Sequence, residues 1–143
     1  MNTATRHALS AYVQTGIESA IPEADPHRLV MMLFDGALAS IADARLNMIR
    51  GQIAARGKAI SKAISIIDQG LKCSLDKSKG GEIAERLDAL YEYICERLFD
   101  ANAQSSAEGL DEAATLLSEL QTAWAAIGGK GPGGLQLVQG ARS

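Results

Sequence analysis

Two histidines and two cysteines are the side chains best suited to metal or nucleophilic chemistry: His7, His27, Cys73 and Cys95. Carboxylate-bridged metal sites in helical proteins use a Glu-x-x-His pair on each of two helices, and no such pair occurs here. Neither cysteine has another Cys or a His at ligand spacing. We therefore expect no metal or cofactor, and we expect both thiols to be reduced and buried.

Three arginines are the residues that an enzyme would need if its substrate were a dianion: Arg28, Arg45 and Arg86. A small all-α enzyme of that kind requires several cations converging on one buried pocket. These arginines sit among polar positions, which is typical of solvated helix faces. Gly80-Gly81 lacks the strand and the further glycines of a phosphate-binding loop. The sequence favours a protein that is not an enzyme, with a small helical enzyme and a helical adaptor for another client as alternatives.

Asp35 and Gly36 stand together in the middle of a long helical pattern. Glycine in a helix interior costs about 1 kcal/mol relative to alanine. An acid beside an apolar stripe needs a partner. Our interpretation is that Gly36 admits a neighbouring helix or bound segment while Asp35 makes a surface hydrogen bond, in preference to a catalytic role.

Composition restricts the class of protein. The chain has 143 residues, 47% of them hydrophobic, which is enough for one domain with a substantial core. A net charge of -3 and a pI near 5.4 lack the basic stripe that nucleic-acid binding requires. No apolar run approaches the roughly 20 residues that span a bilayer, and no secretion signal is present. We expect a cytoplasmic protein without membrane insertion.

Apolar residues recur at three- and four-residue steps through most of the chain, which predicts helices. Asp25 is a good N-cap, Pro26 suits a first helical position, and Gly51 suits the residue after a helix end. The predicted helices are 26–50, 53–77, 81–102 and 106–127.

Short connections between long amphipathic helices require antiparallel neighbours. The predicted fold is all-α: an antiparallel, up-down-up-down four-helix bundle forming one domain over residues 1–127. Residues 1–24 are expected to form a cap segment with a short helical piece. The Gly-rich residues 128–143 are expected to be a disordered tail.

Several blocks of this sequence, in order, resemble the flagellar secretion chaperone family FliS from about Ala11 to Ile127. The blocks are Tyr12, residues 25–29 and 32–37, 58–68, Leu75-Asp76, 80–84, 90–93, Ala101-Asn102 and Trp124. The resemblance implies a chaperone that binds the C-terminal segment of newly made flagellin and prevents premature filament polymerisation. It also implies delivery of flagellin to the flagellar export gate, with no covalent chemistry.

The resemblance and the amphipathic pattern together suggest which residues meet the client. We expect an N-terminal cover over part of the client groove, formed by Leu9, Tyr12, Val13 and Ile17. The expected groove residues, on the flanks of the helical stripes, are Leu29, Met32, Ala63, Ile66 and Tyr91. Trp124 is expected at the core or its rim. An exposed apolar groove serves self-association equally well, so a homodimer is an alternative.

Overall fold

The computed structural model describes residues 25–127, and every regular element in that range is helical. Its long helices are α2 (Pro26–Ile49), α3 (Ile53–Ser65), α4 (Lys77–Gln104) and α5 (Ala107–Ile127). A π-helix, η2 (Ile66–Leu71), and a 3-10 turn, η3 (Lys72–Ser74), continue directly from α3. None of the helices in this range is long and apolar enough to cross a membrane.

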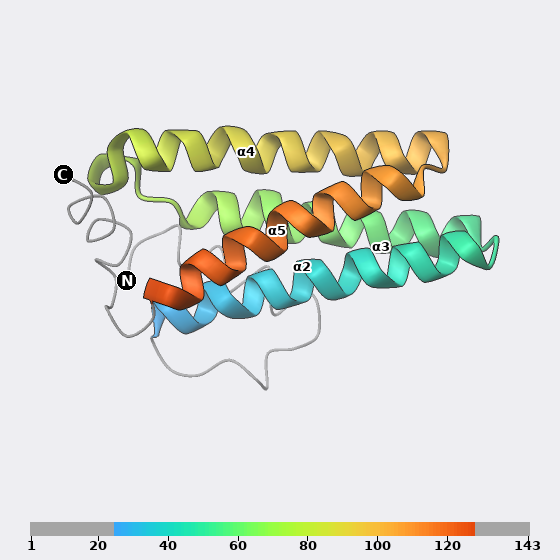
Figure 1. Ribbon diagram of the computed structural model, residues 1–143, viewed down its shortest axis with the longest axis horizontal. Coiled ribbons are helices and arrows are strands. Elements are labelled where there is room, and N and C mark those ends of the chain that lie inside the picture. The colour runs from blue at the N-terminus through green and yellow to red at the C-terminus, as the bar shows by residue number, and fades with distance from the viewer. Residues whose placement is uncertain (1–24, 128–143) are drawn as a thin grey trace.

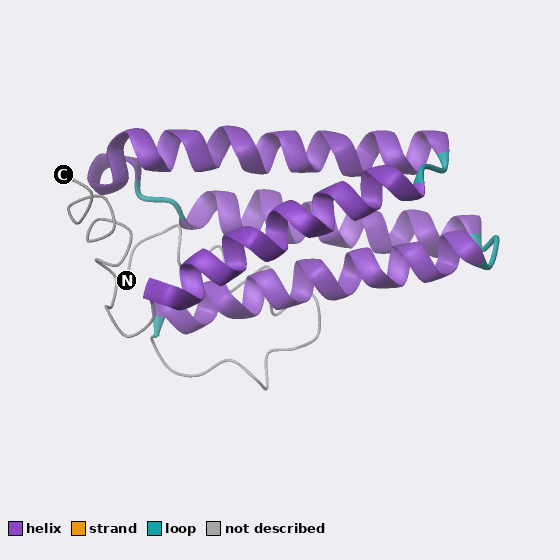
Figure 2. Cartoon of the chain, viewed as in Figure 1, coloured by secondary structure: helices purple, strands orange, loops and turns teal. Residues whose placement is uncertain are grey.

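The four long helices form an antiparallel bundle, as predicted (Figure 1). Each helix packs against the next one in the chain, and α5 closes the bundle against α2. Figure 1 shows α5 crossing the front of the bundle diagonally, from the end of α4 to the beginning of α2. The connections are short loops, which is why consecutive helices are antiparallel (Figure 2).

The first helix begins and ends as its sequence predicts. The Asp25 carboxylate accepts a hydrogen bond from the Arg28 backbone amide at 3.2 Å, and Pro26 takes the first helical position. Gly51 follows the helix with a φ of +70°, a conformation that glycine adopts without strain.

The second helix ends earlier than the predicted 53–77, because the α-helical ladder widens at Ile66 and stops at Ser74. Gly70 in the π-helix lies close to α2, where an added Cβ would sit 3.0 Å from Leu33 Cδ2. A π turn inserts an extra residue and shifts the helical phase. Cys73, predicted to be buried, is therefore exposed on the following turn.

The third helix begins at Lys77, four residues before the predicted 81–102. Asp76 caps it, accepting hydrogen bonds from the backbone amides of Ser78 at 3.1 Å and Lys79 at 3.2 Å. The Ser78 hydroxyl also donates to the carboxylate, at 2.6 Å, and this bond, with the amide bonds, holds the pKa of Asp76 below its ordinary value. The helix then breaks at Gly81, with a φ of +55° and a ψ of −129°, and resumes. The predicted chain reversal therefore contains one helical turn.

The connection from α4 to α5 is two residues long. α4 continues past the predicted Asn102 to Gln104, and Ser105 adopts a left-handed conformation with a φ of 51°. The Ser106 hydroxyl accepts a hydrogen bond from the Gly109 amide at 3.2 Å, so Ser106 precedes the helix as a cap and α5 begins at Ala107.

The core is a single apolar cluster to which α2, α3, η2, α4 and α5 all contribute. Its largest fully buried side chains are Phe34, Leu33, Ile41, Ile60, Ile66, Ile67, Leu71, Ile94, Leu98, Leu110 and Leu117. Small residues such as Ala37, Ala63 and Ala113 are completely buried among them, which lets the helices approach closely.

Arg56 is a charged side chain within this packed interior, only 9% exposed. Its Nε donates to Asn102 Oδ1 at 3.0 Å, its Nη2 to the Asn102 carbonyl at 3.1 Å, and its Nη1 to Ser105 Oγ at 2.8 Å. The guanidinium thus adds a donor to the Asn102 carbonyl, which otherwise accepts only a long bond of 3.4 Å from the Ser105 amide, at the C-terminus of α4, where a positive charge also complements the helix dipole. Arg56 ties the beginning of α3 to the end of α4.

We predict that Arg56→Ala lowers the free energy of unfolding by about 2 kcal/mol, because α4 loses three charge-assisted hydrogen bonds at its C-terminus. Arg56→Lys should recover only part of this, since an ammonium cannot reproduce the planar fork. Urea unfolding followed by circular dichroism measures both variants. The matched control is Arg86→Ala, which removes only an exposed pair with Glu82 and should change stability by less than about 0.5 kcal/mol. Equal effects of the two alanine variants would contradict this role for Arg56.

Candidate functional site

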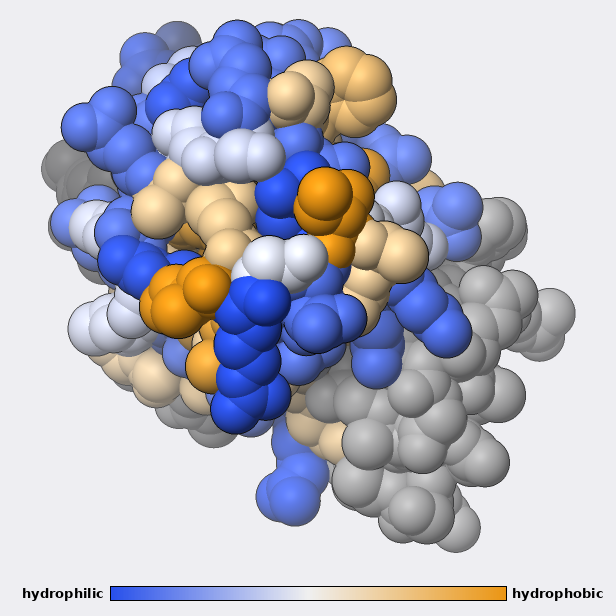
Figure 3. All heavy atoms as spheres, turned by 90° about the vertical axis from the view of Figure 1, so that its right-hand side faces the viewer, coloured by the Kyte–Doolittle hydropathy of each residue, from blue (hydrophilic) through white to orange (hydrophobic). Residues whose placement is uncertain are grey.

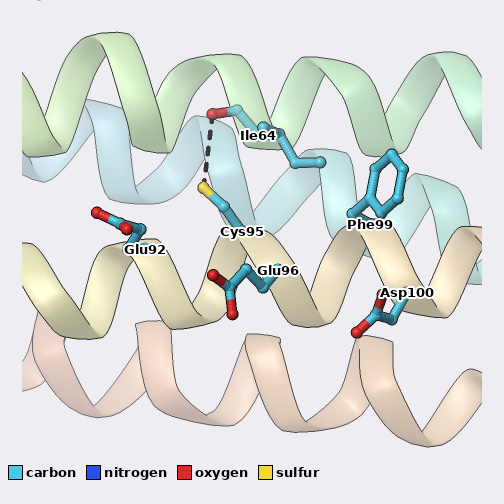
Figure 4. Close-up of a pocket in the computed structure, with 6 residues that line it drawn as sticks. All are labelled: Ile64, Glu92, Cys95, Glu96, Phe99 and Asp100. Atoms are coloured by element: carbon cyan, nitrogen blue, oxygen red, sulfur yellow. Dashed lines mark hydrogen bonds between the residues drawn. The ribbon is translucent and has the colours of Figure 1, made fainter.

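α3 and α4 border a shallow surface groove of about 420 Å³. Ile64 lines it from α3, and all its other lining residues come from α4: Glu92, Cys95, Glu96, Phe99 and Asp100. The α4 residues recur at three- and four-residue steps, so they share one side of that helix. Figure 4 shows Cys95 and Phe99 rising from α4 toward α3, while Glu96 and Asp100 lie on the outer surface of α4. The groove therefore has an apolar centre and an acidic edge.

The α3 side of the groove has small side chains near Ile64. Gly57 and Ser61 precede Ile64 by two turns and one turn of the helix, and both have little or no side chain. An added Cβ at Gly57 would find its nearest neighbour, Asn102 Nδ2, at 3.6 Å, an ordinary contact distance. Packing between α3 and α4 does not require glycine at this position. Small residues along α3 instead leave room for another element to lie against the groove.

Phe99 stands out because it is 67% exposed beside this groove. Leu46, Ile49 and Ile53 are also exposed, around the connection between α2 and α3. Figure 3 looks onto that end of the bundle and shows hydrophobic side chains lying among hydrophilic ones. Single exposed apolar residues are ordinary, but an aromatic beside an apolar hollow indicates a binding surface.

The groove carries little reactive chemistry. The Cys95 thiol lies 3.9 Å from the Ile64 carbonyl oxygen, and burial raises its pKa to about 11. It is therefore a neutral thiol at neutral pH and a poor nucleophile. Within residues 25–127, no group of three or more His, Cys, Asp or Glu residues could hold a metal ion.

The acidic edge is only partly neutralised. Lys72 donates to Glu92 at 3.0 Å and lies 3.8 Å from Asp88, and its hydrogen bond to Glu92 is the main cause of its raised pKa. Neither Glu96 nor Asp100 has an ion pair or hydrogen bond through its carboxylate to any residue in the described range. Two exposed negative charges therefore remain beside Phe99.

Four of the five groove residues expected from the sequence lie in the interior: Leu29 (3% exposed), Ala63 (0%), Ile66 (1%) and Tyr91 (4%). Met32 is partly buried. Burial raises the pKa of the Tyr91 hydroxyl. These positions belong to the seams between helices instead of the flanks, where the sequence analysis placed them. The neighbouring Ile64 and Cys95 line the groove in their place. Leu9, Tyr12, Val13 and Ile17 lie outside the described residues.

The arginines considered for an anion pocket are dispersed. Arg28 and Arg45 are both on α2, about 25 Å apart along its axis at 1.5 Å per residue. Arg45 pairs with Asp111 through hydrogen bonds of 2.6 and 3.1 Å, and Arg86 pairs with Glu82 at 3.3 Å. They do not converge on one pocket, so the substrate site imagined for a helical enzyme is not formed by these residues.

Contacts between α2 and α5 include one that sequence reasoning missed. Trp124 Nε1 donates to the His27 carbonyl at 3.0 Å, and His27 Nε2 donates to the Trp124 carbonyl at 2.8 Å. The two rings stack with centroids 5.0 Å apart. Asp35 accepts a hydrogen bond from Gln121 Nε2 at 2.6 Å, the surface bond that was predicted for it. Partners this far apart in the chain leave no local pattern that identifies them.

Comparison with known proteins gives a consistent result. The model of the family described as flagellar protein FliS matches residues 8–131. The chain is 47% identical over 126 residues to the flagellar secretion chaperone FliS of Salmonella typhimurium, covering 88% of this chain and 93% of that protein. It is 44% identical to the flagellar secretion chaperone FliSB of Pseudomonas aeruginosa, over 84% of this chain and 94% of that one.

A third relative, the flagellar secretion chaperone FliS of Escherichia coli K12, is 40% identical over 80% of this chain and 84% of its own length. The relatives match along nearly the whole helical bundle, including both helices that border the groove. The expected family is thereby confirmed, and this chain belongs to the flagellar protein FliS family.

Proposed function

We propose that this protein is a cytoplasmic export chaperone that binds the C-terminal segment of flagellin. The observation that carries the proposal is the groove between α3 and α4, which places an exposed phenylalanine beside an apolar hollow. The relatives named as flagellar secretion chaperones support the same role. Binding requires no catalytic group, which suits a groove whose only thiol has a raised pKa.

The mechanism follows from apolar burial coupled to folding. A flexible amphipathic segment lays its apolar residues into a groove between helices and orders as it binds. Ordering costs about 2 to 5 kcal/mol or more, so the contacts must exceed that amount. While bound, the apolar residues of the segment are withheld from other flagellin subunits. Filament polymerisation is thereby prevented until the complex reaches the flagellar export gate protein.

The N-terminal residues have a proposed part in this cycle. Leu9, Tyr12, Val13 and Ile17 would cover part of the client surface in the empty protein and move aside when flagellin arrives. Each such side chain contributes about 1.5 to 3 kcal/mol when fully buried, so a few would form a reversible cover. Ala63, Ile66 and Tyr91 are buried, so their proposed contribution is to hold α3 and α4 in place. Leu29 and Met32 lie near the start of α2, which follows the N-terminal segment in the chain.

We predict that Phe99→Ala weakens binding of the C-terminal flagellin segment by about tenfold or more, the loss typical of an aromatic anchor. Calorimetric titration with a synthetic segment from the same cell measures the change. Because Phe99 is mostly exposed, the thermal stability of the free protein should hardly change. Ile49→Ala is the matched control, since Ile49 is a similarly exposed apolar residue outside the groove. If the Phe99→Ala variant binds the segment as tightly as the unmodified protein, the proposal that the segment binds in this groove is wrong.

The proposed N-terminal cover can be tested separately. Replacing Leu9, Val13 and Ile17 by serine should tighten binding of the same segment severalfold, because the client would no longer compete with them. The matched control is serine at three exposed alanines on the bundle: Ala39, Ala42 and Ala123. Unchanged or weaker binding of the N-terminal variant would show that these residues are not a competing cover.

A further inference from the structure

The charges along the groove are arranged in a regular row. Glu92, Glu96 and Asp100 follow one another at four-residue steps on α4, so their carboxylates lie about one helical turn apart. Lys72 neutralises the first of them. Neither Glu96 nor Asp100 forms a salt bridge among residues 25–127, and both lie beside the exposed ring of Phe99. Arg97 attracts Asp100 electrostatically but makes its hydrogen bond to Glu112. This half of the groove is therefore apolar in the middle and negative along its outer edge.

The low opposite wall suggests the shape of the occupant. An α-helix with its side chains is about 10 Å in diameter. Gly57 and Ser61 on α3 have short side chains, so they obstruct little of the space that such a helix would occupy. Side chains four residues apart on such a helix repeat at the same spacing as the carboxylates on α4. An occupant with apolar residues facing Ile64 and Phe99 would place its adjacent positions against Glu96 and Asp100.

We propose that this groove selects a helical segment bearing Lys or Arg beside its apolar face, and that Glu96 and Asp100 are the residues that recognise those cations. The inference rests on the proposed function, and the segment it concerns is that of flagellin. Phe99 supplies the apolar anchor, and an arginine reaching toward the carboxylates can also stack on its ring. The two acids add specificity and speed association more than they add affinity at high salt.

The test compares charge reversals inside and outside the groove. Glu96→Lys and Asp100→Lys together change the net charge by as much as Glu85→Lys and Glu119→Lys together, which alter exposed acids on α4 and α5 away from the groove. The probe is a fluorescently labelled synthetic C-terminal segment of flagellin from the same cell. Its anisotropy is measured at low, physiological and high NaCl concentration, and circular dichroism confirms that each variant is folded.

The unmodified protein should bind the segment several times more weakly at high salt than at low salt. The groove reversal should weaken binding at least tenfold at low salt and reverse the salt dependence, because salt then screens a repulsion, whereas the control pair should stay within about twofold of the unmodified protein. The affinity of the neutral variant, Glu96→Gln with Asp100→Asn, should lie between those of the unmodified protein and the groove reversal.

Other results would overturn the inference in distinguishable ways. If the unmodified protein binds and the groove reversal behaves like the control, flagellin binding stands and the charge selection is wrong. If the unmodified protein does not bind at any salt concentration, the proposed function itself fails. If sedimentation shows that the groove reversal changes self-association while leaving segment binding intact, a second copy occupies the groove and the inference is again wrong.

Discussion

The hydrogen bonds that Arg56 makes across the α3–α4 seam set the geometry on which the proposed binding surface depends. They join the first turn of α3 to the last turn of α4. With that end fixed, Gly57 lies against Asn102, and the next turns of both helices bring Ile64 and Phe99 to opposite sides of one hollow. A buried guanidinium with neutral partners is costly to desolvate, so its retention here is understandable if the seam must hold one fixed shape.

The seam between α2 and α5 contrasts with the seam that forms the groove. α2 and α5 are joined by a bidentate Arg45–Asp111 pair, the Asp35–Gln121 bond and the reciprocal contact of His27 with Trp124. α4 and α5 add a cluster in which Tyr93 and Arg97 both donate to Glu112, and these bonds keep the pKa of Glu112 below its ordinary value. Polar ties of this kind close two seams. Between α3 and α4 the Arg56 bonds hold one end of the seam, and along the groove apolar side chains and carboxylates without a salt bridge remain on the surface.

The sequence was most informative where structure is local. The Asp25 cap, the Gly51 stop and the apolar periodicity depend on neighbouring residues, and the helices appear where those signals predict them. The π-helix at Ile66–Leu71 places Gly70 against Leu33 of α2, a contact distant in the chain that the local sequence does not reveal. The reversal near Asp76 was recognised, but the polar residues that suggested a loop also include a helix cap.

The client-binding residues named from the sequence stay a prediction, and the burial of several of them has a general reason. A helical stripe that faces the core and one that faces a client have the same composition, and Ala63, Ile66 and Tyr91 proved to face the core. Phe99 carried the opposite signal: a large aromatic between an apolar position and the acids Glu96 and Asp100. That signal becomes meaningful only once α3 is known to leave space beside it.

The most direct test of the account is photo-crosslinking from the groove to the client. A photoreactive phenylalanine analogue at position 99, incubated with the C-terminal segment of flagellin and irradiated, should give a crosslinked product that mass spectrometry maps to one apolar face of the segment. The same analogue at position 93, an exposed aromatic site on the α5 side of α4, is the matched control and should crosslink weakly. Strong crosslinking from position 93 and none from position 99 would contradict the claim that flagellin occupies the groove between α3 and α4.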